Sequence, residues 1–250
     1  MVTGLIDSYG EAVFAMLKNL LKTQHAAIAE AGRFGAAAIR SGGLIHTFGT
    51  GHSHLLAEEL FDRAGGLLAV NAILEPSLML HEGIRKSTLL ERMPGLAEQL
   101  LSVQPLHEGD LMIVASNSGR NAVPVEAALY ARHRGLQVAA VTSVAHSQSQ
   151  PPVHSSGKRL FEVADIVIDN GGVPGDGVLE VPGVPVRVCA TSTVTGAFIM
   201  QAVAAAVIEN LQDLGADLPV LQSANVEGYR EHNDRITALY ADQLRQIKAY

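Results

Sequence analysis

The stretch LIHTFGTGHSHLLAEELFDRA, residues 44–64, decides the expected fold. Residues 44–48 form a short apolar run, glycines follow at positions 49 and 51, and an amphipathic helical pattern begins at Ser53. This order predicts a strand, a tight turn and a helix. Such a turn leaves backbone N–H groups free above the strand end, and a helix N-terminus adds a partial positive charge. The stretch therefore suits an anion such as phosphate, with His52 and Ser53 at the mouth of the site.

A second stretch of the same design begins at residue 110. The run DLMIVA is the clearest buried-strand pattern in the chain, and it leads directly into SNSGRN, residues 116–121. Ser116 and Ser118 make the turn rich in hydroxyls, and Asn121 is a suitable N-cap for the helical pattern that follows. In an open parallel sheet, ligands bind beyond the carboxyl ends of the strands. The two turns are expected to meet there, although either one alone would be a weak signal.

Strands alternate with helices along residues 44–214, which predicts a parallel sheet with helices on both faces. The other expected strands are residues 67–72, 137–141, 164–168 and 186–190. Residues 75–88 fit neither period, and irregular polar tracts of this kind often carry residues of a functional site. Residues 145–158 also fit neither period and are expected to form an excursion loop. One domain of 250 residues is expected, with a helical segment at 1–40, an α/β core at 41–215, and a tail with a helix at 216–250.

The composition of the chain excludes several classes of function and location. A net charge of −7 without any block of lysine or arginine argues against nucleic-acid and membrane-surface binding. The single Cys189 rules out an intramolecular disulfide and fits a reducing compartment. Neither a spanning run of about 18 apolar residues nor a signal peptide is evident, so we expect a cytoplasmic protein. Apolar stripes on the first helix and on the tail predict a homo-oligomer.

The two turns, GTGHS and SNSGRN, each after an expected parallel strand, resemble those of the sugar isomerase (SIS) domain family. The resemblance covers roughly residues 35–215, and GHSHLLAEELFDRAGG, EPSLMLHEG and SANVEGYREHN are similar to its phosphosugar isomerase branch. It implies a flavodoxin-like three-layer α/β/α sandwich with a mainly parallel five-stranded sheet, an oligomer, and a sugar phosphate bound at the strand ends. One departure concerns Asn121, because the family's phosphate loop commonly ends in threonine.

The resemblance also implies roles for individual residues. The phosphate is expected on the second loop, and the sugar approaches the first. The substrate-binding residues are then Gly51, His52, Ser53, Ser116, Asn117, Ser118, Asn121, and Thr142 or Ser143 nearby.

Interconversion of an aldose and a ketose moves a proton between adjacent carbons through an enediol, which requires a base and a group that opens the ring. The family's base is usually a glutamate, often helped by a histidine from a distant segment or a neighbouring subunit. Our candidates are Glu58, then Glu82, as the base, and His232 or His54 as ring opener or proton relay. His54 and Glu58 are four residues apart and share one helical stripe.

Three alternatives stay open at this point. A non-catalytic phosphosugar sensor would keep the phosphate site without a base. A deaminase or etherase acting on an amino-sugar phosphate would use the same pocket. A metal-assisted isomerase would draw on His52, His54, His81 and His232, although their spacing does not establish a metal site. GTGHSH lacks the third glycine of a dinucleotide fingerprint and no P-loop is present, so no cofactor is expected and a divalent metal is left open.

Overall fold

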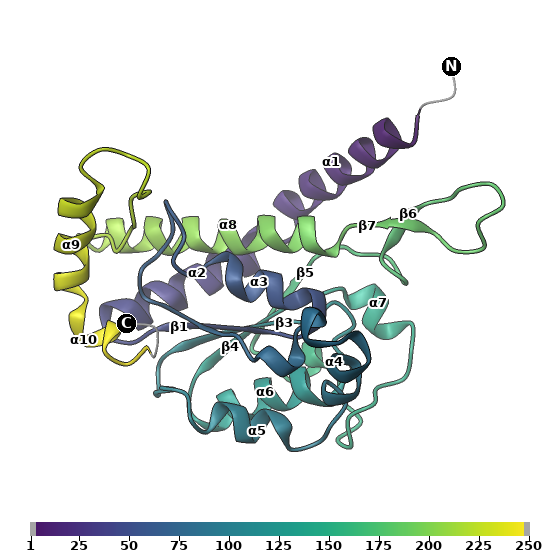
Figure 1. Ribbon diagram of the computed structural model, residues 1–250, viewed down its shortest axis with the longest axis horizontal. Coiled ribbons are helices and arrows are strands. Elements are labelled where there is room, and N and C mark those ends of the chain that lie inside the picture. The colour runs from purple at the N-terminus through teal and green to yellow at the C-terminus, as the bar shows by residue number, and fades with distance from the viewer. Residues whose placement is uncertain (1–3, 248–250) are drawn as a thin grey trace.

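The computed structural model describes residues 4–247 and is built on a five-stranded parallel sheet (Figure 1). Its strand order is β2-β1-β3-β4-β5. The strands are β1 (Ile45–Gly49), β2 (Val70–Ile73), β3 (Leu111–Ala115), β4 (Gln137–Thr142) and β5 (Ile166–Asp169). The chain leaves β1 toward one edge and returns to pair β3 on its other side, so Gly49 lies beside Ala115 in the register. The loops after β1 and β3 therefore flank the point where the strand order reverses, which is where open α/β sheets bind ligands.

Helices cover both faces of the sheet, which confirms the three-layer α/β/α sandwich. One layer contains α2 (His25–Arg40), α3 (His54–Glu59) and α8 (Ser192–Asp213); the other contains α5 (Leu96–Leu101) and α6 (Ala122–His133). Successive strand residues point to opposite faces: Leu111 and Ile113 pack with the first layer, and Met112 and Val114 with the second. Both faces are buried, so the strands read as unbroken apolar runs.

Helix α8 is long and apolar enough to cross a membrane by length and composition. Here it is a core helix, because Ile199, Val203 and Val207 are fully buried in the cluster that also holds Ile28 and Ala31 of α2. The apolar character of α8 thus follows from its position inside the domain.

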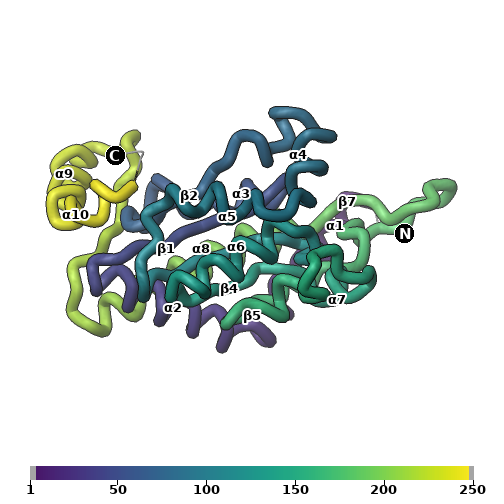
Figure 2. The backbone as a smooth tube through the Cα atoms, turned by 90° about the horizontal axis from the view of Figure 1, so that it is seen from below, coloured from purple at the N-terminus to yellow at the C-terminus, as the bar shows by residue number. Residues whose placement is uncertain are grey.

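Helix α1 (Leu5–Thr23) extends beyond the body of the domain, beside a two-stranded ribbon (Figures 1 and 2). The ribbon pairs β6 (Gly177–Leu179) with β7 (Val188–Ala190) in antiparallel fashion. Tyr9 Oη on α1 donates a hydrogen bond to the Ala190 carbonyl at 2.9 Å. The expected strand at 186–190 is therefore shorter than predicted and lies outside the main sheet, since no crossover helix separates it from β5.

Two further expectations need correction. The helix expected to run from Ser53 to residue 64 ends at Glu59, because Asp62 adopts a positive φ of 44° and the chain turns toward β2. The expected loop at 145–158 begins with a short helix, α7 (Val144–Gln148), which Ser143 caps by accepting a hydrogen bond from the His146 amide at 3.0 Å. Both are short elements whose ends depend on caps and turns more than on apolar periodicity.

Helices α9 (Tyr229–Leu239) and α10 (Ala241–Leu244) lie at the opposite end of the molecule from α4 (Ile84–Leu90) and α7 (Figures 1 and 2). Residues 216–222 tie this helical tail to the start of β2, since Val220 forms a bridge with Leu67. The remaining single-turn helices are η1 (Gly51–Ser53), η2 (Pro76–Leu78), η3 (Leu80–Glu82) and η4 (Leu160–Glu162). The carboxyl ends of the sheet strands point toward α4 and α7, away from the tail.

Candidate functional site

The first loop is closed so tightly that it requires glycine at its start. A Cβ atom on Gly49 would lie 2.2 Å from the Ser53 carbonyl oxygen, far inside van der Waals contact. The chain then forms the single turn η1 with Gly51 at φ +56° and enters α3 at His54. Helix α3 has only six residues, so it supplies less of the N-terminal positive charge than expected.

The residues predicted at the mouth of this loop do face outward. His52 is exposed and Ser53 is half-buried. The irregular tract at 75–88 reaches over the loop, because the side chain of Leu80 would lie 3.9 Å from a Cβ on Gly51. The tract, which contains η2 and η3, therefore packs beside the first loop.

The conformation of the second loop is fixed by Ser116 and Gly119, which belong to the loop itself. Ser116 is buried, and its Oγ accepts a hydrogen bond from the Gly119 amide at 3.1 Å. Gly119 has φ +56°, and a Cβ there would lie 2.9 Å from Thr142 Oγ1. Asn121 occupies the N-cap position of α6, but its side chain makes no capping bond. Ser118 and Asn121 thus keep polar groups free beside the N-terminus of a twelve-residue helix, which favours an anion.

Thr142 and Ser143 are fully buried, and their hydroxyl groups form hydrogen bonds to neighbouring loops. Ser143 Oγ donates to the Gly172 carbonyl at 2.6 Å, and Thr142 Oγ1 donates to the Asn117 carbonyl at 3.4 Å. Asn117 Oδ1 in turn accepts from Asn170 Nδ2 at 2.9 Å. The hydroxyls of Thr142 and Ser143 therefore fix the positions of Asn117 and Gly172.

Two hollows adjoin the second loop. A narrow one is lined by His52 and Ser53 of the first loop, Asn117 of the second, Asn170, and Ser192 and Thr193 at the start of α8. A cleft of about 310 Å³ is lined by Ser118, Asn121, Arg92, Arg120 and His146, together with Gln150 and Val153. The structure thus brings the two predicted loops together.

Sequence reasoning did not single out Arg92, Arg120, His146, Asn170, Ser192 or Thr193 as site residues. Arg120 could have been predicted as a site residue from the sequence, because it lies inside the SNSGRN turn. The others come from segments whose meeting depends on the strand order.

His54 is 2% exposed, and neither ring nitrogen has a hydrogen bond of normal geometry among residues 4–247, although the Gly49 backbone lies close to the ring. Burial lowers the pKa of His54 below its ordinary value of 6.5, the nearby Glu58 carboxylate and the Gly49 backbone act in the opposite direction, and His81 lowers it further. A neutral imidazole is therefore favoured. His54, Glu58 and His81 are near neighbours behind the first loop.

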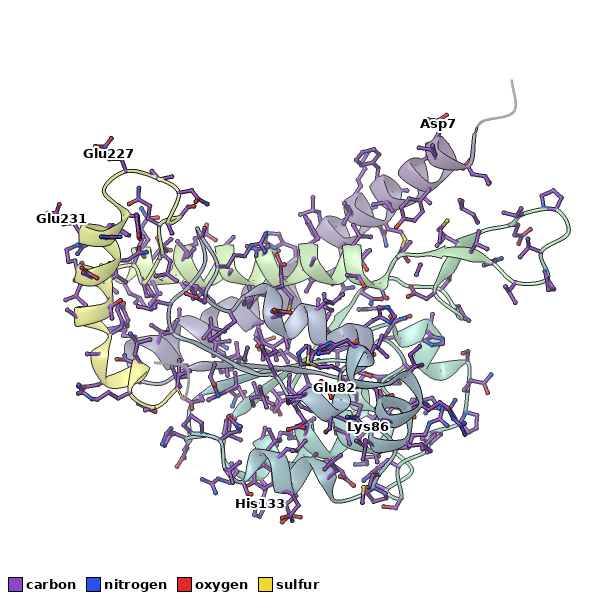
Figure 3. The ribbon with its side chains drawn as sticks, viewed as in Figure 1. Asp7, Glu82, Lys86, His133, Glu227 and Glu231 are labelled. Atoms are coloured by element: carbon purple, nitrogen blue, oxygen red, sulfur yellow. The ribbon has the colours of Figure 1, made fainter. Side chains whose placement is uncertain are left out.

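The structure does not bring the other catalytic candidates together within one chain. Glu58 is exposed on α3, and Glu82 is exposed in η3, where its carboxylate lies 3.3 Å from Lys86 Nζ (Figure 3). His232 lies on α9 at the far end of the molecule, near the labelled Glu231, and its Nε2–H donates to the Val220 carbonyl at 2.9 Å. Across residues 4–247, no three His, Cys, Asp or Glu side chains form a group that fits a metal ion.

A separate polar network lies at the amino ends of the strands. His46 Nε2–H donates to Asp110 Oδ2 at 2.9 Å, and Asn71 Nδ2 donates to His46 Nδ1 at 3.1 Å, so these bonds fix the tautomer of the ring. Asp110 also accepts from the Leu44 and His107 amides. This network fastens β1, β2 and β3 together, and we assign it a structural role.

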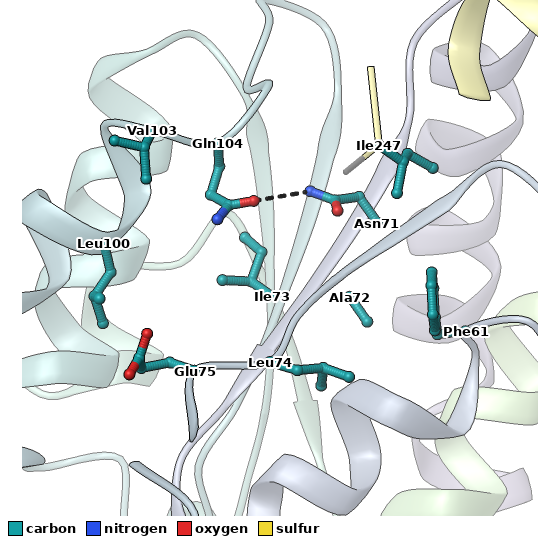
Figure 4. Close-up of a pocket in the computed structure, with 10 residues that line it drawn as sticks. All are labelled: Phe61, Asn71, Ala72, Ile73, Leu74, Glu75, Leu100, Val103, Gln104 and Ile247. Atoms are coloured by element: carbon teal, nitrogen blue, oxygen red, sulfur yellow. Dashed lines mark hydrogen bonds between the residues drawn. The ribbon is translucent and has the colours of Figure 1, made fainter. Parts of the chain in front are cut away.

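A cavity of about 350 Å³ runs along the open edge of β2 (Figure 4). Asn71 Nδ2 and Gln104 Oε1 are 3.5 Å apart across it, and Glu75, Phe61 and Ile247 also line it. None of the residues predicted for the site lines this cavity, so it is distinct from the loop region.

Comparison with known proteins identifies the family and the fold. The profile of the SIS domain matches residues 8–143. The UPF0309 protein lin2794 of Listeria innocua is 43% identical over 240 residues, which is 96% of this chain and 97% of that protein. A phosphoheptose isomerase from Francisella tularensis superposes with a TM-score of 0.54 at 19% identity, over 83% of this chain and all of that chain. The Vibrio vulnificus NanR protein, complexed with ManNAc-6P, gives a TM-score of 0.50 at 16% identity, over 99% of this chain and 71% of that chain. At these identities the likeness to both structures concerns the fold.

Proposed function

This chain belongs to the SIS domain family, within the group of UPF0309 proteins, and from that premise we propose that it binds a sugar phosphate across the two loops. The observation that carries the proposal is that Ser53 of the first loop and Asn117 of the second line one hollow, directly beside the free side chains of Ser118 and Asn121. The phosphate is assigned to Ser118, Asn121 and the N-terminus of α6. The sugar is assigned to the cleft of about 310 Å³ beside these groups, with His52 and Ser53 of the first loop approaching it, because the hollow that His52 and Ser53 line is only about 10 Å³ and cannot hold a sugar.

The reaction we propose is a cofactor-independent aldose–ketose isomerisation. Glu58 is the first candidate for the base because it is exposed on α3, one turn after His54. Glu82 is the second candidate, and its ion pair with Lys86 must open before it can accept a proton. His54, which burial keeps neutral, would relay a proton, and His232 would act only from a second chain. No divalent metal is required by this scheme.

Isotope exchange tests the chemistry separately from binding. The protein is incubated with a sugar phosphate in D₂O, and proton NMR follows the signal on the carbon next to the carbonyl. Proton transfer through an enediol replaces that proton by deuterium and interconverts the two sugars. Binding without exchange or interconversion would contradict the isomerase proposal and leave the binding proposal standing.

A second candidate, a non-catalytic phosphosugar sensor, is favoured by one observation. No aspartate or glutamate lines the narrow hollow or the cleft in the part of the chain that is described, residues 4–247. A sensor needs only the phosphate and sugar contacts. Tight binding in the exchange experiment, with no loss of the proton signal, would select this function.

We also propose that the protein acts as a cytoplasmic homo-oligomer. Ile6 and Phe14 on α1 are 89% and 74% exposed, and Ile84 and Leu89 beside the first loop are exposed as well. Apolar surface of this kind marks contacts between chains. Sedimentation at micromolar concentration is expected to give a species larger than 26.4 kDa, and Phe14→Glu to shift it toward the monomer. A wild-type monomer would contradict the proposal.

A further inference from the structure

The cleft beside the second loop carries more positive charge than a single phosphate requires. Arg92 and Arg120 line it together with His146, Ser118 and Asn121, and none of the described residues that line it carries a carboxylate. The whole chain has a net charge of −7, so the charge of this cationic cleft is opposite in sign to that of the protein as a whole. A local cluster of that kind selects an anionic ligand.

Arg120 has no partner for its charge. Within residues 4–247, no carboxylate pairs with its guanidinium, and its Nε atom is buried without a hydrogen bond. Two other arginines have partners: Arg132 Nε lies 2.9 Å from Asp165 Oδ1, and Arg159 Nε donates to the Ser147 carbonyl at 3.0 Å. Leaving a half-buried guanidinium unpaired is costly unless a ligand supplies the anion.

His146 presents a donor to the same cleft. The Gly175 amide donates to its Nδ1 at 3.2 Å, so the proton of the neutral ring is on Nε2. The backbone amide of His146 is itself held by Ser143 Oγ at 3.0 Å, which fixes the start of α7. The imidazole is thus oriented by the fold, with Nε2–H left to donate.

One phosphate group is already provided for by Ser118, Asn121 and the N-terminus of α6, which contributes its partial positive charge and the Ala122 amide, because the Val123 amide donates to the Glu91 carbonyl at 3.0 Å and Pro124 has no N–H. Two guanidinium groups and the His146 donor remain. Guanidinium binds a carboxylate or a second phosphate in a bidentate, charge-assisted manner. We infer that the ligand of this site is a sugar phosphate that carries a second anionic group, bound by Arg120, Arg92 and His146. This inference rests on the proposed sugar-phosphate site.

The test uses two open-chain ligands that differ only at C1. Glucitol 6-phosphate ends in a hydroxymethyl group, and 6-phosphogluconate ends in a carboxylate. Calorimetry at fixed ionic strength is expected to give at least about 10-fold tighter binding of 6-phosphogluconate to the wild-type protein, since a hydrogen-bonded charge pair contributes that much or more. Fructose 1,6-bisphosphate, set against fructose 6-phosphate, distinguishes a second phosphate from a carboxylate as the preferred group.

Arg120→Gln and Arg92→Gln are expected to remove this preference. Arg92 is exposed, so its variant tests the inference even if Arg120→Gln is unstable. Arg85→Gln is the matched control, because it removes one exposed positive charge from α4 outside the cleft and is expected to keep the full ratio.

The outcomes separate the two proposals. Equal affinity of both ligands in each pair for the wild-type protein, or a ratio that survives in both cleft variants, overturns the second-anion inference and leaves the proposed sugar-phosphate site in place. A loss of the ratio in Arg85→Gln as well would show a general charge effect and also overturn the inference. If none of the four ligands binds, the proposed function fails with it.

Discussion

The loops after β1 and β3 occupy neighbouring places at one edge of the sheet, yet they are built differently. The first is closed around Gly49, enters a helix of six residues, and places the catalytic candidates His54 and Glu58 on that helix. The second leads into a helix of twelve residues, and within residues 4–247 it leaves Ser118 and Asn121 without side-chain hydrogen bonds, beside two arginines without ion pairs. A glycine-rich turn before a helix is therefore not enough to make a phosphate site. From helix length and the available donors we propose that the second loop binds the phosphate and that the first serves the chemistry.

The division of roles is tested most strongly by Glu58→Gln. The amide keeps the size of the side chain but cannot accept a proton, so turnover should fall by about 10²–10⁴-fold while affinity for the sugar phosphate changes little. Turnover and calorimetric affinity are measured on the same preparations. Glu82→Gln serves as the comparison.

If Glu58→Gln stays active and Glu82→Gln is inactive, the base belongs to η3 and our order of candidates is wrong. If neither change alters a measurable turnover, both assignments fail.

The two loop glycines should differ in their effect on stability. Gly49→Ala places a Cβ 2.2 Å from a backbone oxygen, so we expect a loss of about 3 kcal/mol or more in the free energy of unfolding. Gly119→Ala meets a side-chain hydroxyl at 2.9 Å and adopts a positive φ, which should cost about 1–3 kcal/mol.

Gly10→Ala is the control for these glycine changes. It lies inside α1 with nothing within 4 Å of an added Cβ, and it should gain about 0.5–1 kcal/mol. Urea denaturation measures all three. A loss at Gly49 no larger than that at Gly119 would mean that the first loop relaxes easily.

The hydroxyl groups of two serines at the second loop should contribute to the stability of the fold. Ser143→Ala removes two hydrogen bonds, one buried and one partly buried, and is expected to lower the free energy of unfolding by about 1–3 kcal/mol. Ser116→Ala should behave in the same way on a smaller scale, because within residues 4–247 its Oγ bonds only the Gly119 amide. Thermal melts without ligand check both. A melt unchanged in Ser143→Ala would contradict the structural role given to that hydroxyl.

The smallest expected effect concerns His54 and pH. Its pKa is lowered by burial in the folded protein, so between that value and 6.5 the unfolded chain binds more protons than the folded one. The contribution of His54 to stability is therefore complete above pH 6.5 and declines as the pH falls below it. Denaturant titrations at several pH values should show a shallower acid-side slope in His54→Gln. An identical slope in both proteins would contradict the burial argument.

The apolar runs and the alternation of strands with helices were sufficient to predict the parallel sheet, its layers and the meeting of the two loops. The roles of Thr142 and Ser143 could not be read in the same way, because a hydroxyl after a strand looks identical whether it faces a ligand or is bonded beneath the loop. Arg92 lies 28 residues before Arg120, and only the folded chain shows that they share a cleft. The resemblance of 186–190 to the other strands was misleading, because β7 pairs with a neighbour only nine residues away from it.

The central claim is that the second loop holds the phosphate of a sugar phosphate. Calorimetric titration of the wild-type protein and Ser118→Ala, each with a sugar phosphate and with the same sugar lacking its phosphate, tests it most directly. We predict that only the phosphorylated sugar binds measurably, and that Ser118→Ala weakens it by about 1.5–3 kcal/mol, the contribution of a hydrogen bond to a charged group. Equal binding of both sugars, or an unchanged affinity in Ser118→Ala, would contradict the account.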